Sequence, residues 1–125
     1  MINKNKILIV DDAASVVSAI RDMLKPEYKV EIAFSGKDAL EILKEFKPDL
    51  ILLDVMMPGM DGYTVCRKVR SDAAFDFVKI IMVSGKTMLE ERLKGYDAGA
   101  DDYIAKPFSL KSLKQKLIKV LKTDL

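Results

Sequence analysis

The sequence has no histidine, no tryptophan and only one cysteine, Cys66. A lone cysteine cannot form an internal disulfide, and without histidine the chain lacks the usual ligand sets for zinc or haem. No apolar run approaches the roughly 20 residues of a membrane-spanning helix, and residues 1–6 do not form the apolar stretch of a signal peptide. We therefore expect a protein of the reducing cytoplasm, without a membrane partner.

An excess of charge of one sign is also missing, because 21 Lys and Arg residues stand against 19 Asp and Glu residues. Such a balance gives little general attraction to nucleic acid or to anionic lipid. No repeat, low-complexity tract or linker rich in Pro, Gly or Ser divides the 125 residues. The length and the half-apolar composition favour one globular domain that spans residues 1–125.

Short apolar segments alternate with segments of helical periodicity along the chain. Strands are predicted over residues 6–10, 29–34, 50–53, 79–83 and 103–105. The first, third and fourth are almost entirely Ile, Leu, Val or Met, which is typical of parallel strands buried on both faces, whereas the second alternates and is expected at an edge. These strands alternate with five predicted helices, which indicates a doubly wound α/β fold, because parallel strands need crossover connections.

Helix boundaries are marked by capping residues. Ser35 is followed three positions later by an acidic residue, as in a capping box, and Asp61 is placed to cap the third helix. A fourth helix is predicted over residues 88–98 and ends at Gly99, and the last begins at Ser109. The side chains expected to face the core from these last two helices are Leu89, Leu93, Tyr96, Leu110, Leu113, Leu117 and Leu121.

Polar side chains come at the ends of four predicted strands. They are Asp11 and Asp12 after the first strand, Asp54 after the third, Ser84 after the fourth and Lys106 after the fifth. In open α/β sheets, ligands bind beyond the carboxyl ends of the strands. Taken singly, each residue has a commoner use, since such aspartates cap turns, a serine caps a helix and a lysine is solvated. Their joint placement at one edge favours a functional site.

The expected site holds an excess of negative charge. Three carboxylates close together repel one another, and the single amine of Lys106 offsets only one of them. A divalent cation would bring the sum to about zero, and an all-oxygen donor set is the kind that Mg²⁺ prefers. The sequence therefore predicts a magnesium site, given the fold.

Five segments resemble the response regulator receiver domain family, in the family's order and at its spacing. They are residues 7–12 (ILIVDD), 50–54 (LILLD), 57–62 (MPGMDG), 82–84 (MVS) and 99–107 (GADDYIAKP). The resemblance implies a flavodoxin-like receiver fold, with five helices around a parallel sheet of strand order 2-1-3-4-5. It also implies a role in bacterial two-component phosphorelay signalling.

The resemblance further implies the chemistry of the site. Asp54 would accept a phosphoryl group from a sensor histidine kinase or a histidine phosphotransfer protein. Mg²⁺, or Mn²⁺ in its place, would be held by Asp12, Asp54 and the backbone carbonyl of Met56, with Asp11 acting through water. Lys106 would bind a phosphoryl oxygen. Such a domain is not an enzyme in the usual sense, since it catalyses only its own phosphorylation and slow dephosphorylation.

The resemblance also implies a conformational switch. Ser84 would donate its hydroxyl to another phosphoryl oxygen, and Tyr103 would turn from exposed to buried. The face made by the fourth helix, fifth strand and fifth helix would then act on an output domain, on an effector protein or on a second copy in a homodimer. Pro107 matches the family's proline after a cis peptide bond. The simpler alternatives are a half-buried strand aromatic for Tyr103 and a strand-ending proline for Pro107.

Three positions depart from, or vary within, the family pattern. Ala13 stands where many receivers have a third acidic residue, which removes only a peripheral charge. Met56 and Lys86 occupy the two sites that tune how fast the phosphoryl group is lost in the family. Our hypothesis is that the apolar Met56 orients the attacking water poorly and so lengthens the life of the acyl phosphate.

Other functions fit the sequence less well. A magnesium-dependent phosphatase with an aspartyl intermediate would need a second aspartate at Met56, and a flavin-binding flavodoxin would need a phosphate loop where Asp11 and Asp12 stand. The lysines of the last helix suit a solvated face better than a nucleic-acid surface, so direct nucleic-acid binding is not expected. Whether the domain stands alone or is the N-terminal part of a longer regulator stays open.

Overall fold

The computed structural model describes residues 4–85 and 88–122. Along the chain the elements are β1 (Lys6–Val10), α1 (Ala14–Leu24), β2 (Lys29–Ala33), α2 (Gly36–Phe46), β3 (Leu50–Asp54), α3 (Gly62–Arg70), the 3₁₀ turn η1 (Ala73–Phe75), β4 (Lys79–Ser84), α4 (Leu89–Ala98), β5 (Asp102–Ala105) and α5 (Leu110–Leu121). Within the described ranges, no helix is both long enough and apolar enough to cross a lipid bilayer.

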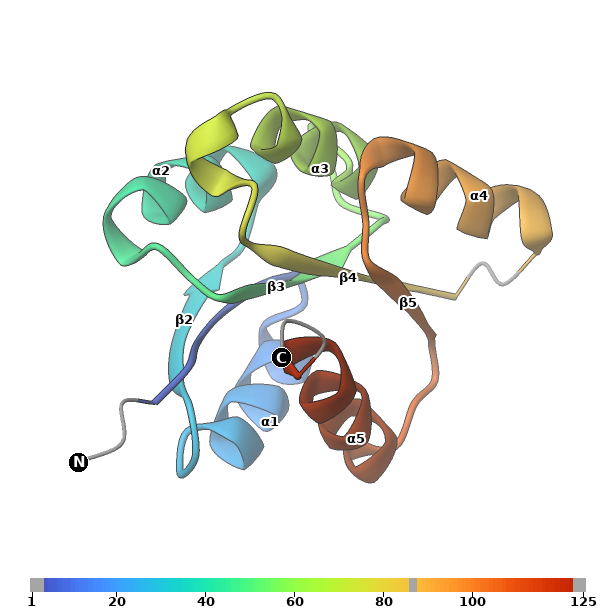
Figure 1. The fold of residues 1–125 in the computed structure, drawn as a ribbon. Coiled ribbons are helices and arrows are strands. Elements are labelled where there is room, and N and C mark those ends of the chain that lie inside the picture. The colour runs from blue at the N-terminus through green and yellow to red at the C-terminus, as the bar shows by residue number, and fades with distance from the viewer. Residues whose placement is uncertain (1–3, 86–87, 123–125) are drawn as a thin grey trace.

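The strands form one parallel sheet in the order β2-β1-β3-β4-β5. Helices α1 and α5 cover one face, and α2, α3 and α4 cover the other (Figure 1). The predicted doubly wound fold and the edge position of the second strand are confirmed. Strands β3 and β4 each run one residue further than predicted, because Asp54 pairs with Val83 and Ser84 pairs with Ala105.

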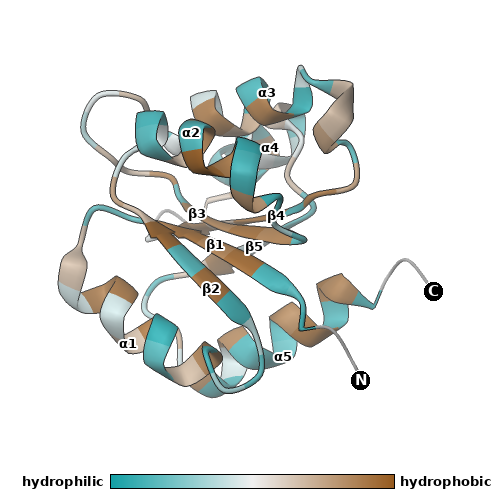
Figure 2. Cartoon of the chain, turned by 90° about the vertical axis from the view of Figure 1, so that its left-hand side faces the viewer, coloured by the Kyte–Doolittle hydropathy of each residue, from teal (hydrophilic) through white to brown (hydrophobic). Residues whose placement is uncertain are grey.

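One hydrophobic core lies on each face of the sheet, which gives two cores in all. Side chains of β1, β3 and β4 alternate between the two faces, so that one set packs against α2 and α3 and the other against α1 and α5. The central strands are accordingly apolar along their length (Figure 2). A sheet covered on both faces leaves its carboxyl edge as the open place for polar groups.

The helix caps agree with the sequence prediction. The side chain of Ser35 accepts a hydrogen bond from the Asp38 backbone N–H at 3.1 Å, and that of Asp61 accepts one from the Thr64 N–H at 2.9 Å. Each bond satisfies an N–H group that the helix itself leaves without a partner. Gly99 ends α4 with a φ of 109°, a left-handed conformation that favours glycine.

The predicted orientation of α4 is wrong. Leu89, Leu93 and Tyr96, which were expected to face the core, are 70%, 54% and 42% exposed. The helix instead packs through the small residues Gly95 and Ala98, which lets its backbone lie close to the sheet. Large apolar residues at helical spacing therefore line its outer face.

One further core prediction fails at the start of α5. Leu110 is 43% exposed, whereas Leu113 and Leu117 are fully buried as predicted. Val120 takes the next inward position, and Leu121 is only partly buried. The buried positions of α5 are thus Leu113, Leu117 and Val120. Leu110 lies beside α1 at the surface.

Candidate functional site

The predicted site residues converge at the carboxyl edge of the sheet. Asp54 is the last residue of β3, and Asp11 and Asp12 directly follow β1. One carboxylate oxygen from each of these three residues lies within 4.8 Å of the others. Asp11 and Asp54 are each only 5% exposed, whereas Asp12 is open to solvent. Two buried acids and one exposed acid thus share a single site.

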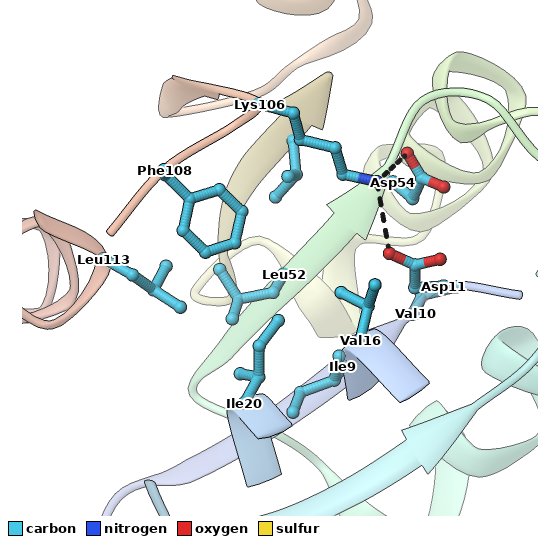
Figure 3. Close-up of a pocket in the computed structure, with 11 residues that line it drawn as sticks. Ile9, Val10, Asp11, Val16, Ile20, Leu52, Asp54, Lys106, Phe108 and Leu113 are labelled. Atoms are coloured by element: carbon cyan, nitrogen blue, oxygen red, sulfur yellow. Dashed lines mark hydrogen bonds and ion pairs between the residues drawn. The ribbon is translucent and has the colours of Figure 1, made fainter. Parts of the chain in front are cut away.

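Lys106 lies between the two buried acids. Its Nζ atom is 3.4 Å from Asp11 Oδ2 and 3.4 Å from Asp54 Oδ1 (Figure 3). Its backbone N–H donates to the Ser84 carbonyl at 2.8 Å, which fixes where the side chain starts. The peptide bond between Lys106 and Pro107 is cis. One ammonium group is therefore shared between two carboxylates from neighbouring strands.

Hydrogen bonds from nearby backbone N–H groups orient the buried carboxylates. Asp11 Oδ1 accepts from the Ala13 backbone N–H at 2.9 Å, as a turn-capping aspartate does. Asp54 Oδ1 lies 3.4 Å from the Met56 backbone N–H. The capping role of Asp11 and its place in the cluster are therefore compatible, because its two oxygens point to different partners.

The charges of the cluster do not balance. Burial raises the pKa of Asp54, and the nearby Asp11 raises it further, while Lys106 and the Met56 N–H lower it. Three carboxylates with one ammonium group leave an excess of two negative charges when all are ionised. Hard carboxylate oxygens with this excess fit a divalent cation such as Mg²⁺.

The floor beneath the cluster is apolar. Below Lys106, the side chains of Phe108, Leu52 and Ile20 lie together (Figure 3). The small cavity among them, about 10 Å³, is too small to hold more than one water molecule. Such surroundings explain why burial is the main cause of the raised pKa of Asp54.

A wider groove shares the side chains of Ile20, Lys106 and Phe108 with this small cavity and opens at the surface. It has a volume of about 570 Å³ and lies between α1 and the segment after β5. Ala19 and Ile20 line it from α1, and Lys106, Phe108 and Leu110 line it from the other side. A protein seated in this groove would touch the stem of Lys106 and lie beside the cluster.

Of the remaining predicted side chains that the structure describes, Ser84 and Tyr103 are buried and Met56 is exposed. Ser84 ends β4 and is buried, one residue beyond the position that pairs with Asp54. Tyr103 is only 5% exposed, so the half-buried environment considered for it is not observed, and the guanidinium carbon of Arg92 lies 5.9 Å from its ring centroid. The Met56 side chain points into solvent. Lys86 lies outside the described residues.

Two features of the site were missed by the sequence prediction. A Cβ atom on Gly62 would lie 2.4 Å from the carbonyl oxygen of Asp54, so only glycine fits where α3 meets the end of β3. The glycine directly after the capping Asp61 was a signal for this contact. Tyr63, the next residue, bonds to Glu91 of α4, and no local sequence pattern indicates that contact.

Comparison with known proteins gives consistent matches. The sequence profile of the response regulator receiver domain matches residues 7–118. Response regulator MprA of Mycolicibacterium vanbaalenii is 41% identical over 118 residues, which cover 94% of this chain and 50% of the relative. MprA of Mycobacterium ulcerans is 42% identical with the same coverage. The chain therefore spans about half the length of the curated relatives it matches.

Solved structures show the same architecture. Chemotaxis protein CheY4 of Vibrio cholerae superimposes with a TM-score of 0.90 at 32% identity, covering 94% of this chain and 99% of that one. A putative response regulator from Chloroflexus aurantiacus gives a TM-score of 0.89 at 34% identity, covering 95% and 98%. The similarity thus extends over the whole sheet and its helices.

Proposed function

Because this chain belongs to the response regulator receiver domain family, we propose that Asp54 accepts a phosphoryl group in a Mg²⁺-dependent reaction. Receiver domains are the regulatory switch domains of two-component signalling, and the chain's function lies in that class. The observation that carries the assignment to Asp54 is its position. It is buried among Asp11, Asp12 and Lys106 at the carboxyl edge of the sheet.

The Asp54 carboxylate acts as the nucleophile. One of its oxygens forms a bond to the phosphorus atom of the donor, and the bond between phosphorus and the leaving group breaks, with its electrons leaving on that group. The product is an acyl phosphate. Lys106 already lies 3.4 Å from Asp54 Oδ1, so its ammonium group is placed to stay beside the new phosphoryl oxygens.

The residues present fit a divalent cation. Asp11, Asp12, Asp54 and the backbone carbonyl of Met56 would hold Mg²⁺, or Mn²⁺ in its place. When bound, the cation supplies positive charge that stabilises the transferring phosphoryl oxygens. The excess of two negative charges in the cluster supports this proposal, because without added positive charge the ionised site would destabilise the fold.

Phosphorylation would change the charge at Asp54 from −1 to roughly −1.5 to −2 and add acceptor oxygens. Ser84, at the end of the neighbouring strand, would donate its hydroxyl to one of these oxygens. Ser84 would move toward the phosphoryl group, and α4, β5 with Tyr103, and α5 would adjust. The exposed apolar residues of α4 would form part of this face and would contact an output domain, an effector protein or a second receiver.

The phosphoryl donor would be a sensor histidine kinase or a histidine phosphotransfer protein. The groove between α1 and the segment after β5 suits its docking, because it is apolar, open and adjacent to Lys106. We do not expect α5 to bind nucleic acid directly. Two lysines of α5 are already paired, Lys114 with Glu27 and Lys116 with Asp102 at 3.3 Å.

The test is incubation with a small phosphoryl donor such as acetyl phosphate, followed by intact mass measurement. We expect a mass increase of one phosphoryl group that requires Mg²⁺ and is absent in Asp54→Ala. Asp76→Ala, which removes an exposed aspartate that is not part of the acidic cluster, should behave like the wild type. Phosphorylation of Asp54→Ala, or uptake that is equal in EDTA, would overturn the proposal.

A further inference from the structure

A hydrogen bond joins the first turn of α3 to the first turn of α4. The hydroxyl of Tyr63 donates to Glu91, lying 2.9 Å from Oε2 and 3.2 Å from the backbone carbonyl of the same residue. Tyr63 is buried, and burial together with the bond to Glu91 raises the pKa of its hydroxyl well above the ordinary value. The hydroxyl is protonated at neutral pH, as an ordinary tyrosine hydroxyl is, and its bond to a carboxylate is of the stronger, charge-assisted kind.

Tyr63 directly follows the residue that packs against the backbone of Asp54. Gly62 leaves no room for a Cβ beside the Asp54 carbonyl, and its N–H donates to the Val55 carbonyl at 3.0 Å. These contacts close the loop between β3 and α3. The same loop carries Met56, whose N–H lies 3.4 Å from Asp54 Oδ1. A shift at the start of α3 would therefore be felt at the carboxylate.

A hollow separates this loop from α4. Its volume is about 360 Å³, and it is lined by loop residues that include Met57 and Gly59 and by Glu91 and Lys94 of α4. Side chains do not pack across such a space, so contacts at its edge set the distance between the loop and the helix. The bond from Tyr63 to Glu91 is such an edge contact.

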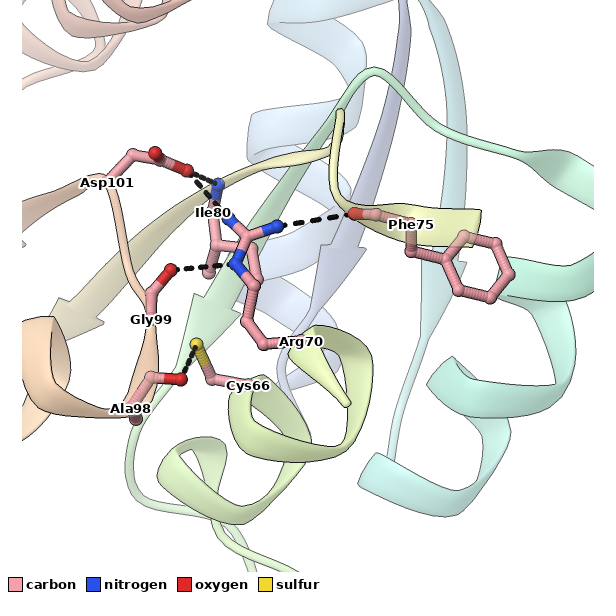
Figure 4. Close-up of polar contacts among 7 residues, drawn as sticks. All are labelled: Cys66, Arg70, Phe75, Ile80, Ala98, Gly99 and Asp101. Atoms are coloured by element: carbon pink, nitrogen blue, oxygen red, sulfur yellow. Dashed lines mark hydrogen bonds and ion pairs between the residues drawn. The ribbon is translucent and has the colours of Figure 1, made fainter. Parts of the chain in front are cut away.

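The two ends of α4 are held differently. Just beyond its C-terminal end, Arg70 Nε donates to the Gly99 carbonyl and Arg70 Nη2 to Asp101 Oδ2, each at 2.8 Å (Figure 4). Asp101 also accepts from the Ile80 N–H at 2.8 Å, which ties this end to the sheet. In the first half of α4 the large apolar side chains are exposed, so packing holds that half weakly.

We infer that Tyr63 and Glu91 form a positioning pair for the reaction proposed at Asp54. Their hydrogen bond fixes the loop after Asp54 against the first half of α4, and so holds the main chain of Met56 beside the carboxylate. Coupling of this kind is reciprocal, so a partner protein that displaces α4 would also loosen the loop. The inference rests on the proposed function and adds a link to α4 that does not run through Ser84.

The test compares variants that break the bond with a matched variant that does not. Tyr63→Phe removes the hydroxyl and keeps the buried ring, and Glu91→Ala removes the acceptor. Glu90→Ala removes an equal charge from the same helical turn at an exposed position. With acetyl phosphate and saturating Mg²⁺, we expect the first two variants to be phosphorylated about threefold to tenfold more slowly than the wild type. Glu90→Ala should keep the wild-type rate.

Two further measurements separate positioning from loss of stability. Glu91→Gln keeps an acceptor for the tyrosine hydroxyl and should stay within about twofold of the wild-type rate. The double variant Tyr63→Phe with Glu91→Ala should be no slower than the slower single variant, because both remove one interaction. Denaturant unfolding of each variant confirms that the rates come from folded protein.

The possible results are distinguishable. Wild-type rates in both Tyr63→Phe and Glu91→Ala, or a double variant slowed by the product of the two single effects, would overturn the positioning pair and leave the proposed function intact. A loss in Glu90→Ala equal to that in Glu91→Ala would also overturn it, since charge alone would then account for the effect. If the wild-type protein takes up no phosphoryl group at all, the proposed function fails and the pair fails with it.

Discussion

The carboxylate of Asp54 and the ammonium group of Lys106 lie 3.4 Å apart, although the two residues are 52 positions apart in the sequence. The same nitrogen lies 3.4 Å from Asp11, so one cation serves two buried acids. The pKa of Asp54 is raised even beside a lysine, because burial, the largest cause, and the charge of Asp11 together outweigh Lys106. Both the chemistry and the stability of the site depend on this charge balance.

Removal of the shared ammonium group should mainly impair phosphoryl transfer. We expect Lys106→Ala to slow phosphorylation by acetyl phosphate by about 100-fold, because the proposed cation and Ser84 would remain but the positive charge of the ammonium group beside the phosphoryl oxygens would be lost. Initial rates by intact mass provide the measurement, with Mg²⁺ affinity followed separately. Lys119→Ala, on the exposed face of α5, is the control. A Lys106→Ala protein that is phosphorylated as fast as the control would contradict the role given to Lys106.

The raised pKa of Asp54 predicts how stability depends on pH. In the metal-free protein the folded state holds the Asp54 proton more tightly than the unfolded chain does. Stability is therefore lost as the pH rises from near the ordinary pKa of 3.8 through the higher folded pKa. Asp54→Asn lacks this loss and should be more stable than the wild type at neutral pH.

Urea unfolding in EDTA at about pH 7 and about pH 3 measures this difference. Near pH 3 the carboxyl group is protonated in both states, so the advantage of Asp54→Asn should largely disappear. An equal gain at both pH values would show that ionisation of Asp54 is not its cause.

The fold and the acidic cluster could be predicted from the sequence because both depend on repeating, local patterns. Buried parallel strands are apolar throughout, and in such a sheet the residues at their carboxyl ends must meet at one edge. Asp11 and Asp54 therefore come together wherever the strands pair as predicted. The register of β3 with β4 brings Ser84 close for the same reason.

The contacts of α4 could not be predicted in this way. Large apolar residues usually mark the buried face of a helix, but α4 packs through Gly95 and Ala98. Its close approach depends on small residues, whose spacing carries little signal. The bond between Tyr63 and Glu91 joins residues 28 positions apart and depends on how α3 and α4 lie on the sheet, which no local pattern specifies.

Metal binding should stabilise the fold measurably. We expect Mg²⁺ to raise the free energy of unfolding of the wild type by about 2.7 kcal/mol at a concentration 100 times its dissociation constant. Asp12→Asn removes the exposed carboxylate of the cluster and should lose most of this gain at the same Mg²⁺ concentration. Asp22→Asn, an exposed aspartate on α1, should keep it. If Mg²⁺ stabilised all three proteins equally against urea, the cation would not be bound at this acidic cluster.

The contact between Gly62 and Asp54 predicts that no side chain larger than that of glycine fits at position 62 without movement of the backbone. In Gly62→Ala the new methyl group would lie 2.4 Å from the Asp54 carbonyl oxygen and 2.8 Å from Val55 Cα, so backbone atoms must move. We expect the free energy of unfolding to fall by about 1–3 kcal/mol. Gly85→Ala is the matched control, because a Cβ there meets no atom within 4 Å. Similar destabilisation of both variants would mean that this contact is not responsible for the loss of stability.

The exposed side chain of Met56 predicts a slow loss of the phosphoryl group. It is 58% exposed and comes two residues after Asp54, where a polar side chain could hydrogen-bond the attacking water but a thioether cannot do so well. Met56→Asn should therefore shorten the lifetime of the acyl phosphate by about threefold to tenfold. The decay of phosphorylated protein after donor removal, followed by intact mass, measures this lifetime. Met56→Leu keeps an apolar side chain and should decay at the wild-type rate, so an asparagine variant that decays no faster would show that water orientation at this position does not limit the reaction.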